Sequence, residues 1–223
     1  MSAPTMPHDE MPRVTRFWNG VARDFDAIYS GDKGRLGRAL DRCLRRDMYQ
    51  RFDWVMEKAA DVRGARVCDI GCGSGRFVTA LARRGAAEVT GIDVAPEMLR
   101  LARELAVEEG VAGACRFVHA DVLDWEAPEG FDLTLAIGVW DYIADPGPRL
   151  RRIRQLTRGK FLSTWPRRWT WRVPLRKARL GLLGCPVHFF SRADVHRHLE
   201  AAGFRVESLE VLGKLFCVVA RPA

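Results

Sequence analysis

A glycine-rich stretch that opens with an acid is the first part of this sequence that can support chemistry. Asp69 begins the segment DIGCGSG (69–75), in which glycine occupies every second position from 71. Glycine adopts backbone conformations that other residues avoid, and it lets a ligand lie against the peptide planes. A helix is expected directly after the segment, so its free N–H groups point at whatever binds there. We therefore predict a nucleotide-type crevice at the carboxyl edge of a sheet, built by Gly71, Cys72, Gly73 and Gly75.

The spacing of these glycines argues against a dinucleotide ligand. A dinucleotide-binding loop reads GxGxxG, whereas this one reads DxGxGxG with its acid at the end of the preceding strand. A pyrophosphate is repelled by the carboxylate of Asp69, whereas an ammonium group is attracted to it. The ligand expected beside the glycines therefore carries a positive charge.

Two more acids stand where the next strands are expected to end. Asp93 comes 22 positions after Gly71, and a carboxylate at this place can accept hydrogen bonds from both hydroxyls of a ribose. Asp121 closes the following strand, in HADV, where the amino group of an adenine can donate to it. Three acids at three successive strand ends suit a ligand that carries a sulfonium and an ammonium.

Short β-branched runs alternate with amphipathic helical stretches from residue 65 onward. The periodicity of apolar residues predicts strands at 65–70, 88–93, 115–121, 131–138 and 159–165. Between them it predicts helices at 75–85, 96–110 and 149–158. Alternation at this spacing is typical of a parallel sheet with right-handed crossovers.

The C-terminal part of the sequence has a different pattern. Ser191 and Asp194 form a capping box, so a helix is expected from there to Gly203. Two β runs follow at 205–212 and 215–220, separated by only two residues. So short a connection predicts an antiparallel hairpin. The sheet is thus expected to be parallel except at this end.

The order of these motifs carries a family resemblance. VCDIGCGSG, GID, HADV and FDLTLAIG resemble the successive motifs of class I S-adenosylmethionine-dependent methyltransferases, over roughly residues 50–223. The resemblance implies an α/β, Rossmann-like, seven-stranded sheet, mostly parallel with an antiparallel last strand and helices on both faces. It also implies S-adenosylmethionine as cofactor, with Asp69 and the glycines at its methionine end and Asp93 at its ribose. Asp121 and Val122 would hold the adenine, and Val94 and Ile137 complete the implied site.

The N-terminal segment is similar to a narrower group. RFWNGVARDFDAIYSGD and LRRDM resemble the N-terminal region of magnesium-protoporphyrin O-methyltransferases, whose helices form a lid over the cofactor. This resemblance implies that Tyr29 and Arg46 lie near the ligand. The chain departs from that branch at Trp140-Asp141-Tyr142, where a histidine is expected before the tyrosine. The resulting layout is a single domain, 1–223, with a disordered tail at 1–14, a helical lid at 15–60, a core at 61–223 and a basic insertion at about 165–190.

Three residues are candidates for the catalytic side of the crevice. Asp141 can orient or deprotonate a nucleophile, and Tyr142 can line the acceptor pocket. It is equally consistent with the sequence that Asp141 caps the following loop and that Tyr142 is a packing aromatic. His188 can reach the pocket mouth or serve a structural role beside a helix N-cap. A carboxylate acceptor, with a pKa of about 4, is already ionised and needs no base, whereas a phenol or an amine would need Asp141 or His188.

Basic and aromatic residues are concentrated after the fifth predicted strand. No acid occurs between Asp145 and Asp194, and the net charge of the chain is +8. The segment suits a cap over an anionic, flat acceptor, a peripheral membrane contact through 165–180, or an RNA contact. It also suits a solvated basic face with tryptophans packed underneath. The residues concerned are Trp165, Arg167, Arg168, Trp169, Trp171, Arg172, Arg176, Lys177 and Arg179.

Composition narrows the function classes further. None of the six cysteines forms a CxxC pair, so we expect neither a disulfide framework nor a metal site. The N-terminal stretch lacks an apolar segment of the signal-peptide kind, and we expect a cytoplasmic protein. GVWDY stands where a nucleic-acid methyltransferase would carry an Asn-Pro-Pro-Tyr-like segment, so a small-molecule acceptor, anionic or aromatic, is favoured over RNA. A catalytically silent S-adenosylmethionine-binding regulator is the other alternative.

Overall fold

One sheet of seven strands organises the part of the chain that the computed structural model describes, residues 11–26, 46–127, 130–168 and 187–223. The strands are β1 (Arg66–Ile70), β2 (Glu88–Asp93), β3 (Cys115–His119), β4 (Phe131–Ile137), β5 (Thr157–Pro166), β6 (Phe204–Leu212) and β7 (Leu215–Pro222). Their order across the sheet is β3-β2-β1-β4-β5-β7-β6. The strands β1 to β5 pair in parallel, whereas β7 is antiparallel to both β5 and β6. The predicted fold class is confirmed, including the terminal hairpin.

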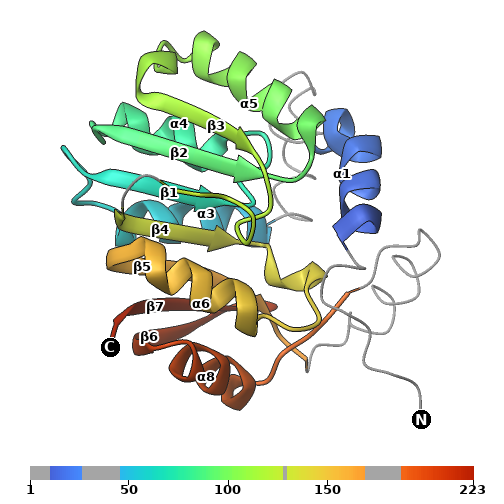
Figure 1. Cartoon of the computed structure of the whole chain (residues 1–223), viewed down its shortest axis with the longest axis vertical. Coiled ribbons are helices and arrows are strands. Elements are labelled where there is room, and N and C mark those ends of the chain that lie inside the picture. The colour runs from blue at the N-terminus through green and yellow to red at the C-terminus, as the bar shows by residue number, and fades with distance from the viewer. Residues whose placement is uncertain (1–10, 27–45, 128–129, 169–186) are drawn as a thin grey trace.

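Helices cover both faces of the sheet, as Figure 1 shows. The helices α3 (Arg46–Lys58), α4 (Arg76–Arg83) and α5 (Pro96–Glu108) lie on one face, and α6 (Gly147–Leu156) and α8 (Arg192–Ala201) lie on the other. Each face has its own apolar core. The first core contains Val55, Leu81, Leu99 and Leu162, and the second contains Trp140, Phe161, Trp165 and Phe204.

The capping box predicted from the sequence begins α8. Ser191 accepts a hydrogen bond from the backbone N–H of Asp194 at 3.1 Å, and Asp194 accepts one from the backbone N–H of Ser191 at 2.9 Å. The backbone N–H and the hydroxyl of Ser191, which both donate to the carboxylate of Asp194, lower its pKa to about 2 together with the neighbouring Arg197. The cap sets the direction in which α8 leaves the sheet edge.

The first helix, α1 (Met11–Asp26), lies beside the carboxyl ends of the parallel strands (Figure 1). Its first residue is Met11, three residues before the predicted end of the tail at residue 14. The side-chain oxygen of Asn19 accepts a hydrogen bond from the backbone N–H of Glu97 at 3.3 Å. This bond satisfies one of the free N–H groups at the start of α5 and ties the two helices together.

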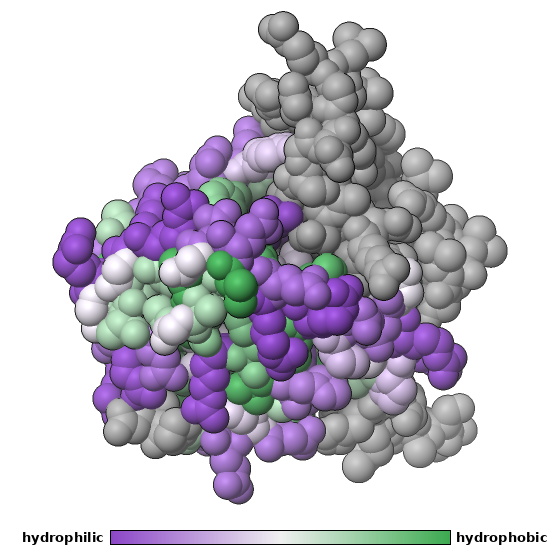
Figure 2. Space-filling view, turned by 90° about the horizontal axis from the view of Figure 1, so that it is seen from above, coloured by the Kyte–Doolittle hydropathy of each residue, from purple (hydrophilic) through white to green (hydrophobic). Residues whose placement is uncertain are grey.

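Hydrophilic residues cover much of the described surface seen from above, with hydrophobic ones gathered in a smaller area among them (Figure 2). Among the described residues, no helix has both the length and the apolar character needed to cross a membrane.

Candidate functional site

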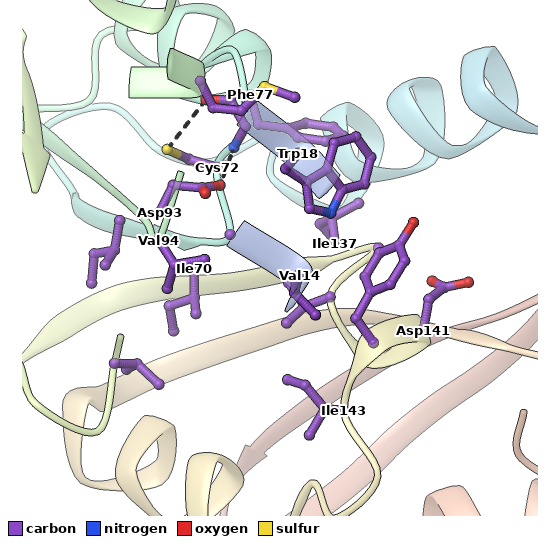
Figure 3. Close-up of a pocket in the computed structure, with 18 of the residues that line it drawn as sticks. Val14, Trp18, Ile70, Cys72, Phe77, Asp93, Val94, Ile137, Asp141 and Ile143 are labelled. Atoms are coloured by element: carbon purple, nitrogen blue, oxygen red, sulfur yellow. Dashed lines mark hydrogen bonds between the residues drawn. The ribbon is translucent and has the colours of Figure 1, made fainter. Parts of the chain in front are cut away.

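A pocket of about 300 Å³ opens where β1, β2 and β4 reach their carboxyl ends. Loops after these strands and after β3 form its floor, and α1 covers it with Met11, Val14 and Trp18. In Figure 3, Asp93 and Asp141 lie at opposite sides of the labelled group, with Val14 and Trp18 drawn between them. The pocket therefore runs across several strand ends beneath a helix from the start of the chain.

The glycine loop of the pocket requires glycine for steric reasons. Gly71 has φ +70°, and a Cβ atom there would lie 2.6 Å from Cγ2 of Val139. The backbone N–H groups of Gly71 and Cys72 both donate to the carbonyl oxygen of Ile92, at 2.8 and 3.0 Å. The loop is thus held against the end of β2 and leaves an open cradle of peptide planes.

Asp93 fixes the other side of this cradle. Its carboxylate accepts the backbone N–H of Gly73 at 2.8 Å and that of Ala95 at 2.9 Å. Burial raises the pKa of Asp93, and the hydrogen bonds from Ala95 and Gly73 oppose that rise. The two bonds orient the carboxylate, which lines the pocket at the place expected for a ribose.

Asp69 occupies a different position from the one expected. The residue is 1% exposed and is not among those that line the pocket. Burial and the neighbouring charge of Asp93 raise its pKa to about 8, and Arg51 acts in the opposite direction. A direct contact between Asp69 and a ligand is thus not part of this geometry.

Arg51, from α3, contributes a cationic group that sequence reasoning missed. It lines the pocket and lies close to Gly138. A Cβ atom added to this glycine would lie 2.8 Å from Nη1 of Arg51. Its Nε atom is buried and has no hydrogen-bond partner among the described residues. A guanidinium aimed into a cradle closed by Gly71 and Gly138 is suited to a carboxylate.

Asp121 and Arg149 form a buried ion pair at the far end of the pocket. Nη2 of Arg149 donates to Oδ2 of Asp121, and the side chains are 4% and 11% exposed respectively. The other oxygen, Oδ1, accepts the backbone N–H of Leu123 at 3.1 Å. Both side chains line the pocket, so the carboxylate predicted for the adenine carries a partner from α6.

The short helix η2 (Trp140–Tyr142) brings the candidate catalytic residues to the pocket. Trp140 is fully buried and stacks on Trp165 of β5, with ring centroids 4.8 Å apart. Asp141 and Tyr142 line the pocket, and the ring of Tyr142 meets that of Trp18 edge to face, with centroids 5.6 Å apart. A buried tryptophan therefore anchors the loop whose next two residues face the site.

Comparisons with known proteins bear on this geometry. The family model described as "Methyltransferase domain" matches residues 67–159. The ubiquinone biosynthesis O-methyltransferase of Aeromonas salmonicida (strain A449) is 38% identical over 117 residues, which cover 51% of this chain and 49% of that protein. Residues 67–159 are therefore similar to a methyltransferase domain, and the chain is similar to these O-methyltransferases over about half of its length. It spans about half the length of the curated relatives it matches.

Solved structures share the fold of this chain. The magnesium protoporphyrin IX methyltransferase of Synechocystis PCC 6803 with bound S-adenosylhomocysteine superimposes with a TM-score of 0.79 at 20% identity, over 96% of this chain and 100% of that chain. The 1,6-didemethyltoxoflavin-N1-methyltransferase of Burkholderia thailandensis gives a TM-score of 0.71 at 20% identity, over 100% of this chain and 93% of that one. It too is described with S-adenosylhomocysteine bound.

Most of the residues that the sequence predicted for the site do line the pocket. They are Gly71, Cys72, Gly73, Asp93, Val94, Asp121, Val122, Ile137, Asp141 and Tyr142. Gly75 does not, because it begins α4 at φ +77° and packs against Ala102 of α5. His188 does not either, and its backbone N–H donates to the carbonyl of Asp141 at 2.8 Å. Tyr29 lies outside the described residues, as does the side chain of Arg46 at the start of α3.

Sequence reasoning missed several pocket residues besides Arg51. They include Met11, Val14, Trp18, Met98, Arg149 and Lys214. A signal existed for Trp18, which stands in the N-terminal segment expected to form a lid. Lys214 occupies the two-residue connection of the predicted hairpin, whose antiparallel pairing puts it at the carboxyl edge of the sheet.

The described part of the basic insertion is structural. Trp165 is fully buried in β5 between Trp140 and Phe190, so it belongs to the core and cannot act as a cap over an acceptor. Arg167 donates to the carbonyl of Gly213 at 2.6 Å, and its guanidinium lies over the ring of Phe216. Residues 169–186, with the remaining tryptophans and basic residues, lie outside the described residues. Within the described ranges, no group of three His, Cys, Asp or Glu side chains is placed to hold a metal ion.

Proposed function

We propose that this domain binds S-adenosylmethionine and transfers its methyl group to a small, flat, anionic acceptor. The observation that carries the proposal is the arrangement of Asp93 and Asp121 in the pocket wall at the ends of β2 and β3, next to a cradle after β1 that admits only glycine at position 71. The cofactor fits this cradle in charge as well as in shape. Arg51 can pair with its carboxylate, and the acidic strand ends suit its ribose and its adenine.

Each part of the cofactor has a proposed partner. Asp93, held by the N–H groups of Gly73 and Ala95, presents its remaining lone pairs to the ribose hydroxyls. Val122 is buried beside Asp121 and supports the adenine. Asp69 acts at a distance, as a buried group beneath the methionine end rather than as a contact.

The acceptor is proposed to bind where the pocket is both aromatic and basic. Trp18 and Tyr142 form one wall there, and Lys214 lies on the pocket lining with them. An aromatic pair suits a flat ring, and an ammonium suits an anionic substituent. The names of the similar proteins support this class of acceptor, because they specify methylation of protoporphyrin, of a toxoflavin precursor and of a ubiquinone precursor oxygen.

The residues of this chain would act mainly by positioning. When bound, S-adenosylmethionine supplies an electrophilic methyl group for an in-line displacement. Alignment of the acceptor against the wall that Trp18 and Tyr142 form can contribute several kcal/mol to catalysis. Val14 and Trp18 of α1 exclude water from above. An acceptor that starts protonated gives its proton to Asp141, which is 5% exposed and lines the pocket.

Calorimetric titration with S-adenosylmethionine, S-adenosylhomocysteine and NAD tests the cofactor. Binding of the first two without NAD supports the proposal, and their failure to bind overturns it. Replacing Asp93 with Ala should weaken both affinities about tenfold or more, because it removes the ribose acceptor and releases the N–H of Gly73. The matched control is Asp124→Ala, at an exposed carboxylate outside the pocket wall.

A methyl-transfer assay then tests the acceptor class. Carboxylated porphyrins, catechols and hydroxybenzoates are incubated with the cofactor, and the gain of one methyl group is followed by mass spectrometry. Transfer to any of them excludes a silent regulator. Transfer to RNA instead would overturn the small-molecule assignment. The cytoplasmic location, the membrane contact through 165–180 and the layout of lid and core stay predictions of the sequence.

A further inference from the structure

We propose that Arg149 is a specificity-determining residue of the cofactor site, which with Asp121 reads the edge of the adenine ring. The inference rests on the proposed function, because it takes the pocket to bind an adenosyl group. Arg149 comes from α6, and neither the motifs of the glycine loop nor those of the strand ends include it.

The carboxylate of Asp121 is held on both sides. Oδ1 accepts from the N–H of Leu123, and Oδ2 accepts from Nη2 of Arg149. A carboxylate fixed at both oxygens keeps one orientation toward the pocket. Because the guanidinium carries several N–H donors and the bond to Asp121 uses one of them, Arg149 retains donors for a ligand.

The burial of Asp121 and Arg149 argues against a role for this ion pair in fold stability alone. Both side chains are nearly inaccessible, and the cost of removing two charges from water offsets much of their attraction. A pair of apolar residues would hold α6 against the end of β3 at least as well. The position of the pair in the wall of the pocket instead suits recognition of a polar ligand edge.

The donor and acceptor pattern of the pair matches adenine. Adenine presents an amino donor beside a ring-nitrogen acceptor on its pairing edge. Asp121 is an acceptor and Arg149 a donor, side by side, so each faces its complement. Hypoxanthine reverses the pattern, with a carbonyl acceptor beside a ring N–H donor. Since a guanidinium never loses its proton in proteins, Arg149 cannot adapt to that reversal.

The test compares S-adenosylhomocysteine with S-inosylhomocysteine by calorimetry. In the unmodified protein we expect the adenosyl ligand to bind at least about tenfold more tightly. Arg149→Met should lower adenosyl affinity and relieve the mismatch with the ring N–H of inosine, so the preference falls about tenfold or more. Arg151→Met on the same helix removes an equal charge from an exposed side chain outside the pocket, and should leave the preference unchanged.

The outcomes separate the possible roles. If Arg149 only holds α6 in place, Arg149→Met lowers both affinities equally and leaves the preference intact, which overturns the proposal. Arg149→Lys keeps a cation that can only donate, so it provides a folded variant in which the preference should be retained at least in part, and loss of the preference in this variant as well would overturn the role of the donor. Failure of the unmodified protein to bind S-adenosylhomocysteine would overturn the proposed function itself. Binding with no adenosyl preference would overturn only the role of Arg149.

Discussion

Replacing Asp69 with Asn should make the protein without cofactor less sensitive to alkaline pH. The carboxyl group of Asp69 is 1% exposed, and burial together with the charge of Asp93 raises its pKa from 3.8 to about 8. Between these two values the folded chain keeps a proton that the unfolded chain has released. This group therefore lowers the free energy of unfolding as the pH rises from about 4 toward 8, and the loss is complete above the folded pKa.

The size of the pKa shift of Asp69 determines how much stability is lost. From pH 6 to pH 8, the linkage relation gives a loss of about 2 kcal/mol in the free energy of unfolding that is due to Asp69 alone. Urea denaturation of the unmodified protein and of Asp69→Asn at pH 6, 7 and 8 measures it, because the amide does not titrate. Titrating groups that do not interact with Asp69, such as His198, are common to both proteins and cancel in the comparison.

The matched control is Asp124→Asn, at an exposed carboxylate on the loop after β3. Its curve of stability against pH should run parallel to that of the unmodified protein. Parallel curves for Asp69→Asn as well would refute the reasoning, because they would mean that Asp69 titrates near its ordinary value despite its burial.

Three further predictions concern other parts of the fold. Arg51→Met should weaken the binding of S-adenosylhomocysteine about tenfold or more in calorimetry. The affinity for 5′-methylthioadenosine, which lacks the carboxylate, should not change. Equal losses of affinity for both ligands would contradict the pairing of Arg51 with the carboxylate. Trp140→Ala should lower the free energy of unfolding by about 3–5 kcal/mol in urea titration, because it leaves a cavity against Trp165. A loss of less than about 1 kcal/mol would show that this stack does not anchor η2. Asp194→Ala should cost about 1 kcal/mol at pH 7 through loss of the helix cap. That contribution is fully present above the unfolded pKa of 3.8 and is lost as the pH falls toward about 2, so a difference independent of pH would argue against the capping role.

The sheet and its glycine loop could be predicted from the sequence because the patterns that indicate them are local. Periodicity and turn residues locate each strand, and the positive φ angles of Gly71 and Gly73 favour glycine at both positions through the local backbone alone. The parallel order then follows from the alternation of strands and helices, and the hairpin from the short connection at Gly213.

The two arginines of the site could not be predicted from the sequence in the same way. Arg51 and Arg149 stand in α3 and α6, among many other arginines of similar local surroundings. What distinguishes them is their packing beside Gly138 and Asp121, which only the folded chain brings about. Trp165 shows the opposite error, because its basic neighbours suggested a surface role although its own position in β5 buries it.

The position of β7 has a consequence for how the chain is made. Ribosomes deliver the strands in the order β1 to β7, yet β7 pairs between β5 and β6. The outer edge of β5 therefore stays unpaired throughout synthesis until residues 215–222 have emerged, and an unpaired edge with apolar side chains is a site of aggregation. Because β6 contacts the rest of the sheet through β7, the two strands must dock together as a preformed hairpin. Nascent chains halted before residue 215 should accordingly require chaperone protection that the finished chain does not.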